Sequence, residues 1–307
     1  MAGALRARNV VAREIGYARH FSRWTPLPLT SRTQERYSGR EAIPIPTILH
    51  GIIGAMTYIH AIILGIVEGL TEFLPVSSTG HLILTSRLLG LPQSEFMKTF
   101  EISIQVGAIL AVVLIYWRRL LTDIETLKRV LAAFIPTAIV GLLLYKLIKK
   151  YLFSGTGVVL WSLFIGGVVL IVFDKWYGSK ERTASDVSLP KAAGIGLFQS
   201  LAVIPGVSRA GATILGGLAL GIDRKTIVEF SFLLAVPTLA AATALDLAKN
   251  ASSFDASQWR LLLAGGVVSF VTAIAGIRFF LGFIEKRGFT AFGVYRIALA
   301  LFFWAFV

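Results

Sequence analysis

Two carboxylates stand close together inside an apolar stretch near the start of the hydrophobic part of the chain. Glu68 and Glu72 occupy positions i and i+4 of the run EGLTEFLPVSSTGH (68–81), so a helix would place them on one face. Like charges at this spacing repel, and a buried carboxylate in a membrane is costly. The pair therefore requires a compensating cation, a shared proton or a water-filled cavity. A structural salt bridge to a neighbouring helix is the alternative.

A turn rich in hydroxyl groups follows the acidic pair. The segment PVSSTGH supplies Ser77, Ser78, Thr79, Gly80 and His81. A turn that opens a helix directs free backbone N–H groups at a ligand, which favours a phosphate or a carboxylate. Small residues also let membrane helices pack closely, so Ser77 and Thr79 have a structural alternative. A lone histidine is usually a packing residue, but the two nearby glutamates favour a chemical role for His81.

A second polar segment, PGVSRAGAT (205–213), brings Gly206, Ser208, Arg209 and Thr213. Arginine presents a planar set of donors that suits phosphate oxygens, and Arg209 is the expected partner of the acidic pair. Together the two segments offer acid, hydroxyl, imidazole and guanidinium groups, an inventory that suits phosphoryl transfer.

The composition indicates a membrane protein. The 307 residues are 55% hydrophobic and 15% charged, and the mean hydropathy is +0.74. The absence of cysteine excludes disulfides, thiolate metal sites and a cysteine nucleophile. The net charge of +13 fits basic loops at a membrane surface, so membrane lipids, and no nucleic acid, are the expected partners.

Apolar blocks recur along the chain from Met56 onward. Pro and Gly interrupt the first block (59–89) and the fifth (192–220), which a continuous helix in lipid could not readily accommodate. We therefore predict an all-α integral membrane protein with two re-entrant helical hairpins. Six transmembrane helices are predicted from the other blocks: 102–117, 130–147, 158–173, 230–247, 261–283 and 289–307.

The two broken blocks resemble each other at an offset of 131 residues, which relates Ser77 to Ser208 and Gly80 to Gly211. Each is followed by three predicted spans, so the chain divides into repeats of about 56–180 and 188–307. An odd number of crossings predicts an inverted-topology repeat, with the hairpins meeting near the midplane. The Arg-rich residues 1–55 are expected to be a disordered extension or to precede the functional start at Met56.

Loop charge predicts the orientation. From Met56 onward, one face carries Arg118, Arg119, Lys128, Arg129, Lys175, Lys180, Arg182, Lys191, Arg224, Lys225, Lys286 and Arg287. The other face carries only Arg87, Lys98, Lys149, Lys150, Lys249 and Arg260. The richer face should be cytoplasmic, which places the mouth of the first hairpin and the C-terminus outside.

The two polar motifs, together with KTFEISIQVGAILAVV (98–113) and EFSFLLAVPTLAAATALDL (229–247), resemble the undecaprenyl-diphosphate phosphatase family, also called the bacitracin-resistance protein family. The resemblance covers nearly everything after Met56. The family's Glu-x-x-x-Glu motif falls on Glu68 and Glu72, and its Pro-Gly-x-Ser-Arg motif on Pro205 to Arg209. One departure is Ala210, where the family commonly has serine.

The resemblance implies an enzyme of the bacterial cytoplasmic (inner) membrane that removes the terminal phosphate of a C55 polyprenyl diphosphate. This reaction recycles the carrier lipid for cell-wall polymers. With the topology above, the active site would face the periplasmic leaflet. A homodimer is left open.

The mechanism that fits this reaction assigns a role to each motif. Arg209 clamps the diphosphate, while Glu68 and Glu72 hold a divalent metal ion, Mg²⁺ or Ca²⁺. Ser78 or a water attacks, with His81 as proton acceptor or itself the nucleophile. The remaining predicted substrate-binding residues are Ser77, Thr79, Gly80, Gly206, Ser208 and Thr213.

Other classes of protein share parts of this pattern. A secondary transporter or a lipid flippase of inverted-repeat architecture would use Glu68 and Glu72 as a proton relay. An assembly partner without activity is the third alternative.

Overall fold

The computed structural model describes residues 56–151, 156–177 and 186–306. No described residue lies in a strand, which confirms the predicted all-α class. The Arg-rich segment 1–55 lies outside the described residues. The helices are α3 (Tyr58–Thr71), α4 (Ser78–Leu88), α5 (Glu95–Ser103), α6 (Gln105–Thr122), α7 (Ile124–Tyr151), α8 (Thr156–Tyr177), α9 (Leu189–Gln199), α10 (Arg209–Ala219), α11 (Arg224–Asn250), α12 (Ala256–Lys286) and α13 (Thr290–Phe306), with short 3₁₀ turns at Ser200–Val203 and Ala251–Ser253.

Five stretches of the described chain are long and apolar enough to cross a membrane: Glu95–Thr122, Ile124–Leu144, Thr156–Trp176, Arg224–Ser253 and Ala256–Lys286. The sixth predicted span corresponds to α13, an apolar helix of 17 residues. The span Glu95–Thr122 begins seven residues before the predicted block 102–117. It begins there because Ser94 caps α5 by accepting a hydrogen bond from the Met97 N–H.

Both interrupted blocks are broken helices, as predicted. The first gives α3 and α4, separated by residues 72–77, and the second gives α9 and α10, separated by residues 200–208. Pro75 and Pro205 lie in these loops, since proline removes a backbone donor and cannot continue the helix. Ser77 and Ser208 cap the following helices, accepting from the N–H groups of Gly80 (3.3 Å) and Gly211 (3.0 Å).

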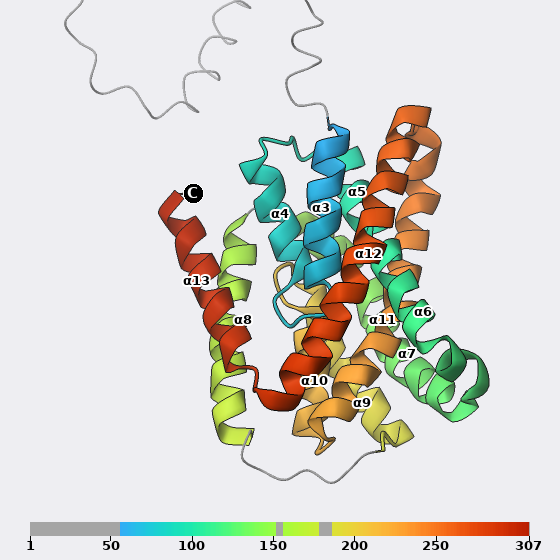
Figure 1. Ribbon diagram of the computed structural model, residues 1–307, viewed down its shortest axis with the longest axis vertical. Helices are drawn as coiled ribbons and strands as arrows, with labels where there is room; N and C mark the ends of the chain where they lie inside the picture. The colour runs from blue at the N-terminus through green and yellow to red at the C-terminus, as the bar shows by residue number, and fades with distance from the viewer. Residues whose placement is uncertain (1–55, 152–155, 178–185, 307) are drawn as a thin grey trace, which may run out of the picture. The chain divides into compact units, whose positions relative to one another are not determined.

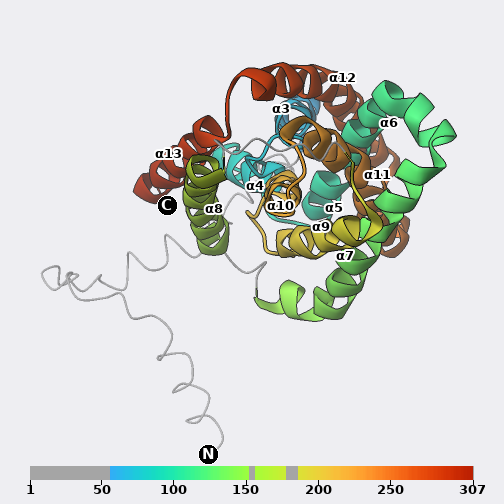
Figure 2. The same ribbon diagram turned by 90° about the horizontal axis from the view of Figure 1, so that it is seen from below.

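The two broken helices lie at different ends of the bundle. Figure 1 shows α3 and α4 in its upper half and α9 and α10 in its lower half, with their connecting loops between them. Seen end-on in Figure 2, α3, α4 and α10 lie inside a ring of longer helices that includes α6, α7, α8, α12 and α13. The motif residues of these loops that would be costly against lipid, such as Glu72 and Ser208, are buried by protein, whereas the apolar Leu201 and Ile204 of the second loop are exposed.

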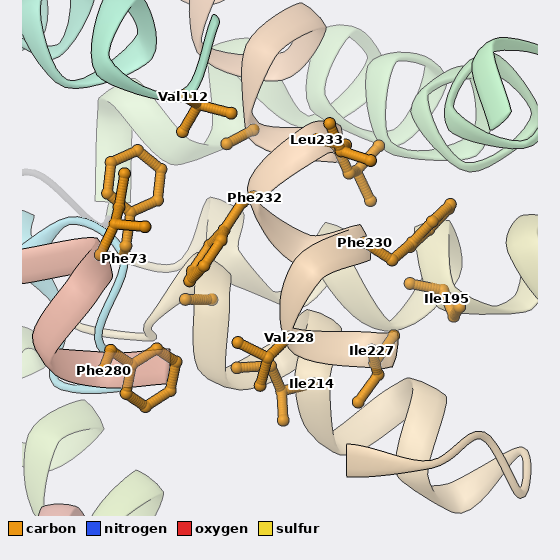
Figure 3. Close-up of a cluster of buried hydrophobic side chains, with 14 of the residues drawn as sticks. Phe73, Val112, Ile195, Ile214, Ile227, Val228, Phe230, Phe232, Leu233 and Phe280 are labelled. Carbon is orange, nitrogen blue, oxygen red and sulfur yellow. The ribbon is translucent and has the colours of Figure 1, made fainter. Parts of the chain in front are cut away.

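An aromatic cluster supports the loop of the first broken helix. Phe73 packs edge-on against Phe232 of α11 at 5.3 Å between ring centroids, and Phe232 lies 6.1 Å from Phe280 of α12. Figure 3 shows the three rings together with Ile214 of α10 and Val112 of α6. All three phenylalanines are buried, so the core fixes the position of Phe73, which directly follows Glu72.

Close backbone packing fixes α3 against α12. A Cβ atom built on Gly65 would lie 2.6 Å from the carbonyl oxygen of Gly265, and one on Gly69 would meet Ser269 and Thr272. Small residues allow this approach in membrane bundles. The position of α3, which ends at the catalytic candidate Glu72, therefore depends on these glycines.

We expect Gly65→Ala to lower the free energy of unfolding by about 1–3 kcal/mol, because the added methyl group overpacks the α3–α12 contact. Gly282→Ala in α12 is the matched control, since its Cβ would meet nothing within 4 Å. Thermal unfolding in detergent micelles measures both variants. Equal melting temperatures for the two would contradict this account of the interface.

Candidate active site

Glu72 joins the two polar motifs. Its Oε1 accepts a hydrogen bond from Nη2 of Arg209 at 2.7 Å, and its Oε2 accepts one from the hydroxyl of Ser78. Glu72 follows the last turn of α3, whereas Arg209 and Ser78 open α10 and α4. The predicted pairing of Arg209 with the acidic pair is thus confirmed for Glu72, across 137 residues of sequence.

Arg209 is held in place from several sides. Its Nη1 donates to the carbonyl oxygen of Ser231 at 2.9 Å, and its guanidinium lies 5.7 Å from the ring centroid of Phe73. Its Nε is buried and has no hydrogen-bond partner among the described residues. A guanidinium that lines a cavity and is already fixed is suited to binding an anion without reorganisation.

Glu68 lies one turn before Glu72 and is fully buried. Neither of its carboxylate oxygens has a hydrogen-bond partner among the described residues. A buried carboxylate without a partner is costly, so Glu68 requires a proton or a cation. The two carboxylate oxygens without partners fit the predicted use of Glu68 as a ligand for a hard divalent ion.

The protein alone offers few ligands for such an ion. No group of three His, Cys, Asp or Glu side chains within the described residues could hold a metal. Each oxygen of Glu72 already accepts one hydrogen bond and keeps a further lone pair. Glu68 and Glu72 therefore fit an ion that takes its other ligands from phosphate oxygens and water, as Mg²⁺ commonly does.

Ser78 and Glu72 are hydrogen-bonded as a nucleophile and its base would need to be. The Ser78 side chain is buried at the first turn of α4, and its hydroxyl donates to Glu72 rather than to water. A serine hydroxyl that donates to a carboxylate can transfer its proton as it attacks. The residue before it, Ser77, has a left-handed backbone with φ of 71°, which sharpens the turn from which Ser78 projects.

The hydrogen bonds of His81 within the described residues go to partners other than Ser78. Its Nδ1 lies 2.8 Å from the carbonyl oxygen of Ser77 and its Nε2 lies 2.7 Å from the hydroxyl of Tyr295. A carbonyl oxygen only accepts, so Nδ1 carries the proton and Nε2 accepts from Tyr295. The geometry does not support the expected role of His81 as proton acceptor or nucleophile, because both ring nitrogens are engaged and Glu72 is the acceptor beside Ser78.

A cavity of about 580 Å³ opens at this cluster. Its polar end is lined by Glu72, Ser77, Ser78, Thr79, Ser208 and Arg209. Most of its remaining wall is apolar and comes from α7 and α11, including Phe134, Ala138, Leu142, Ala241, Ala242 and Leu245. Further polar side chains line it too: Gln105, Thr137, Gln199, Thr238, Asp246 and Lys249. A largely apolar cavity that holds the Glu72–Arg209 cluster suits an amphiphile with an anionic head and a hydrocarbon tail.

Three predicted substrate-binding residues lie outside the cavity lining. Gly80 packs against the side chains of Val159 and Leu163, and Gly206 adopts φ of 88° close to the backbone of Val159. The Thr213 hydroxyl lies 2.9 Å from the carbonyl oxygen of Arg209 and 3.1 Å from Oε1 of Gln199. These residues shape the loops and α10, and the structure does not support a direct contact with phosphate.

Sequence reasoning missed several polar residues around the site. Gln199 lines the cavity and donates to the hydroxyls of Thr137 (3.0 Å) and Thr238 (3.1 Å). In the sequence, the one indication of a role for Gln199 is that the 131-residue offset relates it to Glu68. Arg296 and Tyr295 of α13 contact the two loops and His81, and an arginine inside an apolar block was a signal for them.

Comparison with known proteins shows the family of this chain. The sequence model of the family described as bacitracin resistance protein BacA matches residues 61–302. The chain belongs to this family. A relative from Aquifex aeolicus, named undecaprenyl-diphosphatase, is 53% identical over 254 residues, which cover 82% of this chain and 99% of the relative. Two further relatives have the same name. The one from Persephonella marina is 54% identical over 255 residues, which cover 82% of this chain and 100% of the relative. The one from Thermus thermophilus is 48% identical over 252 residues, which cover 81% of this chain and 97% of the relative.

Family membership and the apolar helices together identify a multi-pass membrane protein. Unpaired charges are expensive inside the apolar helix bundle of such a protein. The buried Glu72–Arg209 pair is therefore expected to contribute to stability.

We expect Arg209→Met to lower the free energy of unfolding by about 3–5 kcal/mol, because it leaves Glu72 buried without its cation. The double variant Glu72→Gln/Arg209→Met should recover most of this loss, since no unpaired charge remains. Lys128→Met, which breaks the exposed Lys128–Glu125 pair, is the control and should melt like the parent. A single variant as stable as the parent would show that the pair contributes nothing.

Proposed function

We propose that this chain is an undecaprenyl-diphosphate phosphatase. It hydrolyses the terminal phosphate of the C55 lipid diphosphate to the monophosphate, and so returns the carrier lipid to cell-wall synthesis and confers bacitracin resistance. The observation that carries the proposal is Glu72, which accepts from both Ser78 and Arg209 at the charged end of an apolar cavity. Relatives of about 50% identity that are named for this activity support it.

In the proposed reaction, Arg209 binds the terminal phosphate and the lipid chain occupies the apolar part of the cavity. The Ser78 oxygen bonds to the terminal phosphorus, and the bond from that phosphorus to the bridging oxygen breaks, releasing undecaprenyl monophosphate. Glu72 takes the Ser78 proton. A water then attacks the phosphoserine, which frees inorganic phosphate and restores the serine. Ser77, Thr79 and Ser208 lie at the same end of the cavity and donate to the phosphate.

Glu68 and Glu72 would hold a Mg²⁺ or Ca²⁺ ion, which supplies neutralisation of charge on the phosphoryl oxygens. The unpartnered oxygens of Glu68 support this assignment. Glu68 does not line the cavity, whereas Glu72 does; Glu68 would add a second carboxylate to the ion's ligands.

The fold proposed for the membrane is an inverted repeat of about 56–180 and 188–307, with six transmembrane helices and two re-entrant hairpins. Shifting α4 (Ser78–Leu88) by 131 residues reproduces the bounds of α10 (Arg209–Ala219), including the serine cap. The packing is reciprocal: α3 approaches α12 at Gly65, and α9 approaches α7 at the shifted position, Gly196. Both observations support the repeat.

The loop charges support an orientation with the first hairpin and the C-terminus outside the cytoplasm. Hydrolysis would then take place at the periplasmic leaflet of the bacterial inner membrane.

Phosphate release from undecaprenyl diphosphate by the purified chain in detergent tests the activity. We expect turnover by the parent without any ion gradient, which a transporter or flippase would not show. Ser78→Ala should lower kcat about 1,000-fold or more, because the nucleophile is lost, and Glu72→Gln should also abolish most activity. Ser252→Ala, at an exposed position, is the control. A Ser78→Ala rate above about 5% of the parent would favour direct attack by water.

Chelation tests the metal. We expect EDTA to remove nearly all activity and added Mg²⁺ or Ca²⁺ to restore it, because a carboxylate pair and a diphosphate repel without a cation. Glu68→Gln should raise the metal concentration needed for half-maximal activity by about tenfold or more, since it removes one anionic ligand. Full activity after exhaustive chelation would remove the ion from the proposal.

A further inference from the structure

Arg296 is a buried arginine of α13 that the reaction above does not use. Its relative exposure is 2%, and no ion pair to a carboxylate is found for it within the described part of the chain. An arginine inside an apolar helix is costly unless its donors are satisfied. Its position in the last helix, far in sequence from both motifs, raises the question of what it binds.

Within the described residues, the Arg296 guanidinium donates only to backbone carbonyls. Nη1 donates to Pro75 at 3.2 Å, and Nη2 donates to Gly206 at 3.1 Å. Nη2 and Nε also donate to two carbonyls of α8, at Ser162 (2.9 Å) and Leu163 (3.3 Å). One side chain therefore joins the loops of both broken helices to α8.

The two loop carbonyls belong to the segments that carry the reacting groups. Pro75 lies midway between Glu72 and Ser78, and Gly206 lies three residues before Arg209. Both lie outside helices, so their oxygens lack the usual helical partner and need a donor within the bilayer. Arg296 meets this need for both loops at once.

Arginine is suited to this position and lysine is not. Its planar fork presents five donors in fixed directions, whereas a lysine ammonium is a point charge with three donors and cannot span four carbonyls. The neighbouring Gly166 of α8 leaves room for the fork, because a Cβ atom there would clash with the Arg296 guanidinium. The contact thus depends on two residues from different helices.

We propose that Arg296 is a positioning residue of the phosphatase reaction. By binding Pro75 and Gly206 together, it holds Glu72 and Ser78 in register with Arg209. It does not line the cavity, so it acts through the loops and not on the lipid. The adjacent Tyr295 adds a second tie to the first motif through His81. This inference rests on the proposed function, because register matters only if the three groups act on one phosphate.

Two substitutions test the contact from opposite sides. Arg296→Lys keeps the charge but loses the fork, and Gly166→Ala keeps the arginine but displaces it. Their matched controls are Arg278→Lys, at an exposed arginine of α12, and Gly157→Ala, at a glycine of α8 whose Cβ would meet nothing within 4 Å. Each purified full chain is assayed with undecaprenyl diphosphate, and kcat is expressed per folded protein from thermal unfolding.

We expect both test variants to lower kcat about 100-fold with KM within about threefold of the parent, because misplaced reacting groups impair the transition state while the tail still binds. The double variant should fall no further than the lower single variant, because both changes remove one contact. Both controls should retain parental kcat.

Three results would overturn the proposal: parental kcat in both test variants, a change confined to KM, or a loss explained wholly by a smaller folded fraction. If Arg296→Lys does not fold, the Gly166→Ala and Gly157→Ala pair decides alone. A parent without phosphate release would instead refute the proposed function, so the two failures are distinguishable.

Discussion

The ion pair between Glu72 and Arg209 is the interaction on which the rest of the structure depends. Each charge would be too costly alone inside an apolar bundle, so each requires the other. Because one group follows α3 and the other opens α10, the two broken helices must meet in the interior. The third member, Ser78, is then placed against Glu72 by the short turn that begins α4.

Breaking two helices inside a membrane protein creates a second constraint, since the loop backbones lose their helical hydrogen bonds. The molecule satisfies these groups with its own side chains. Ser77 and Ser208 cap the new helix starts, and Arg296 binds carbonyls of both loops. These side-chain hydrogen bonds replace the missing helical bonds of the loop backbones. They also hold the reacting groups in fixed positions, which preorganises the site.

The cavity separates two kinds of recognition. Donors and a carboxylate from three helix termini line one part of it, whereas most of the lining from α7 and α11 is apolar, with Asp246 and Lys249 of α11 as the charged exceptions. A lipid diphosphate presents the same division between head and tail. Glu68 is fully buried with both oxygens unpartnered, so it requires a proton or a cation.

The sequence by itself determined the membrane class, the two helix breaks and the inventory of reacting groups, because hydropathy, proline and glycine act locally and leave a readable pattern. It also indicated that Arg209 must pair with the acidic motif, since a buried charge needs a partner. Only the tertiary structure decided that Glu72, and not His81, accepts from Ser78. It alone showed that Gly80, Gly206 and Thr213 shape the loops, and that Arg296 joins them. These assignments depend on side-chain directions and on contacts between helices more than 100 residues apart, which local periodicity does not encode.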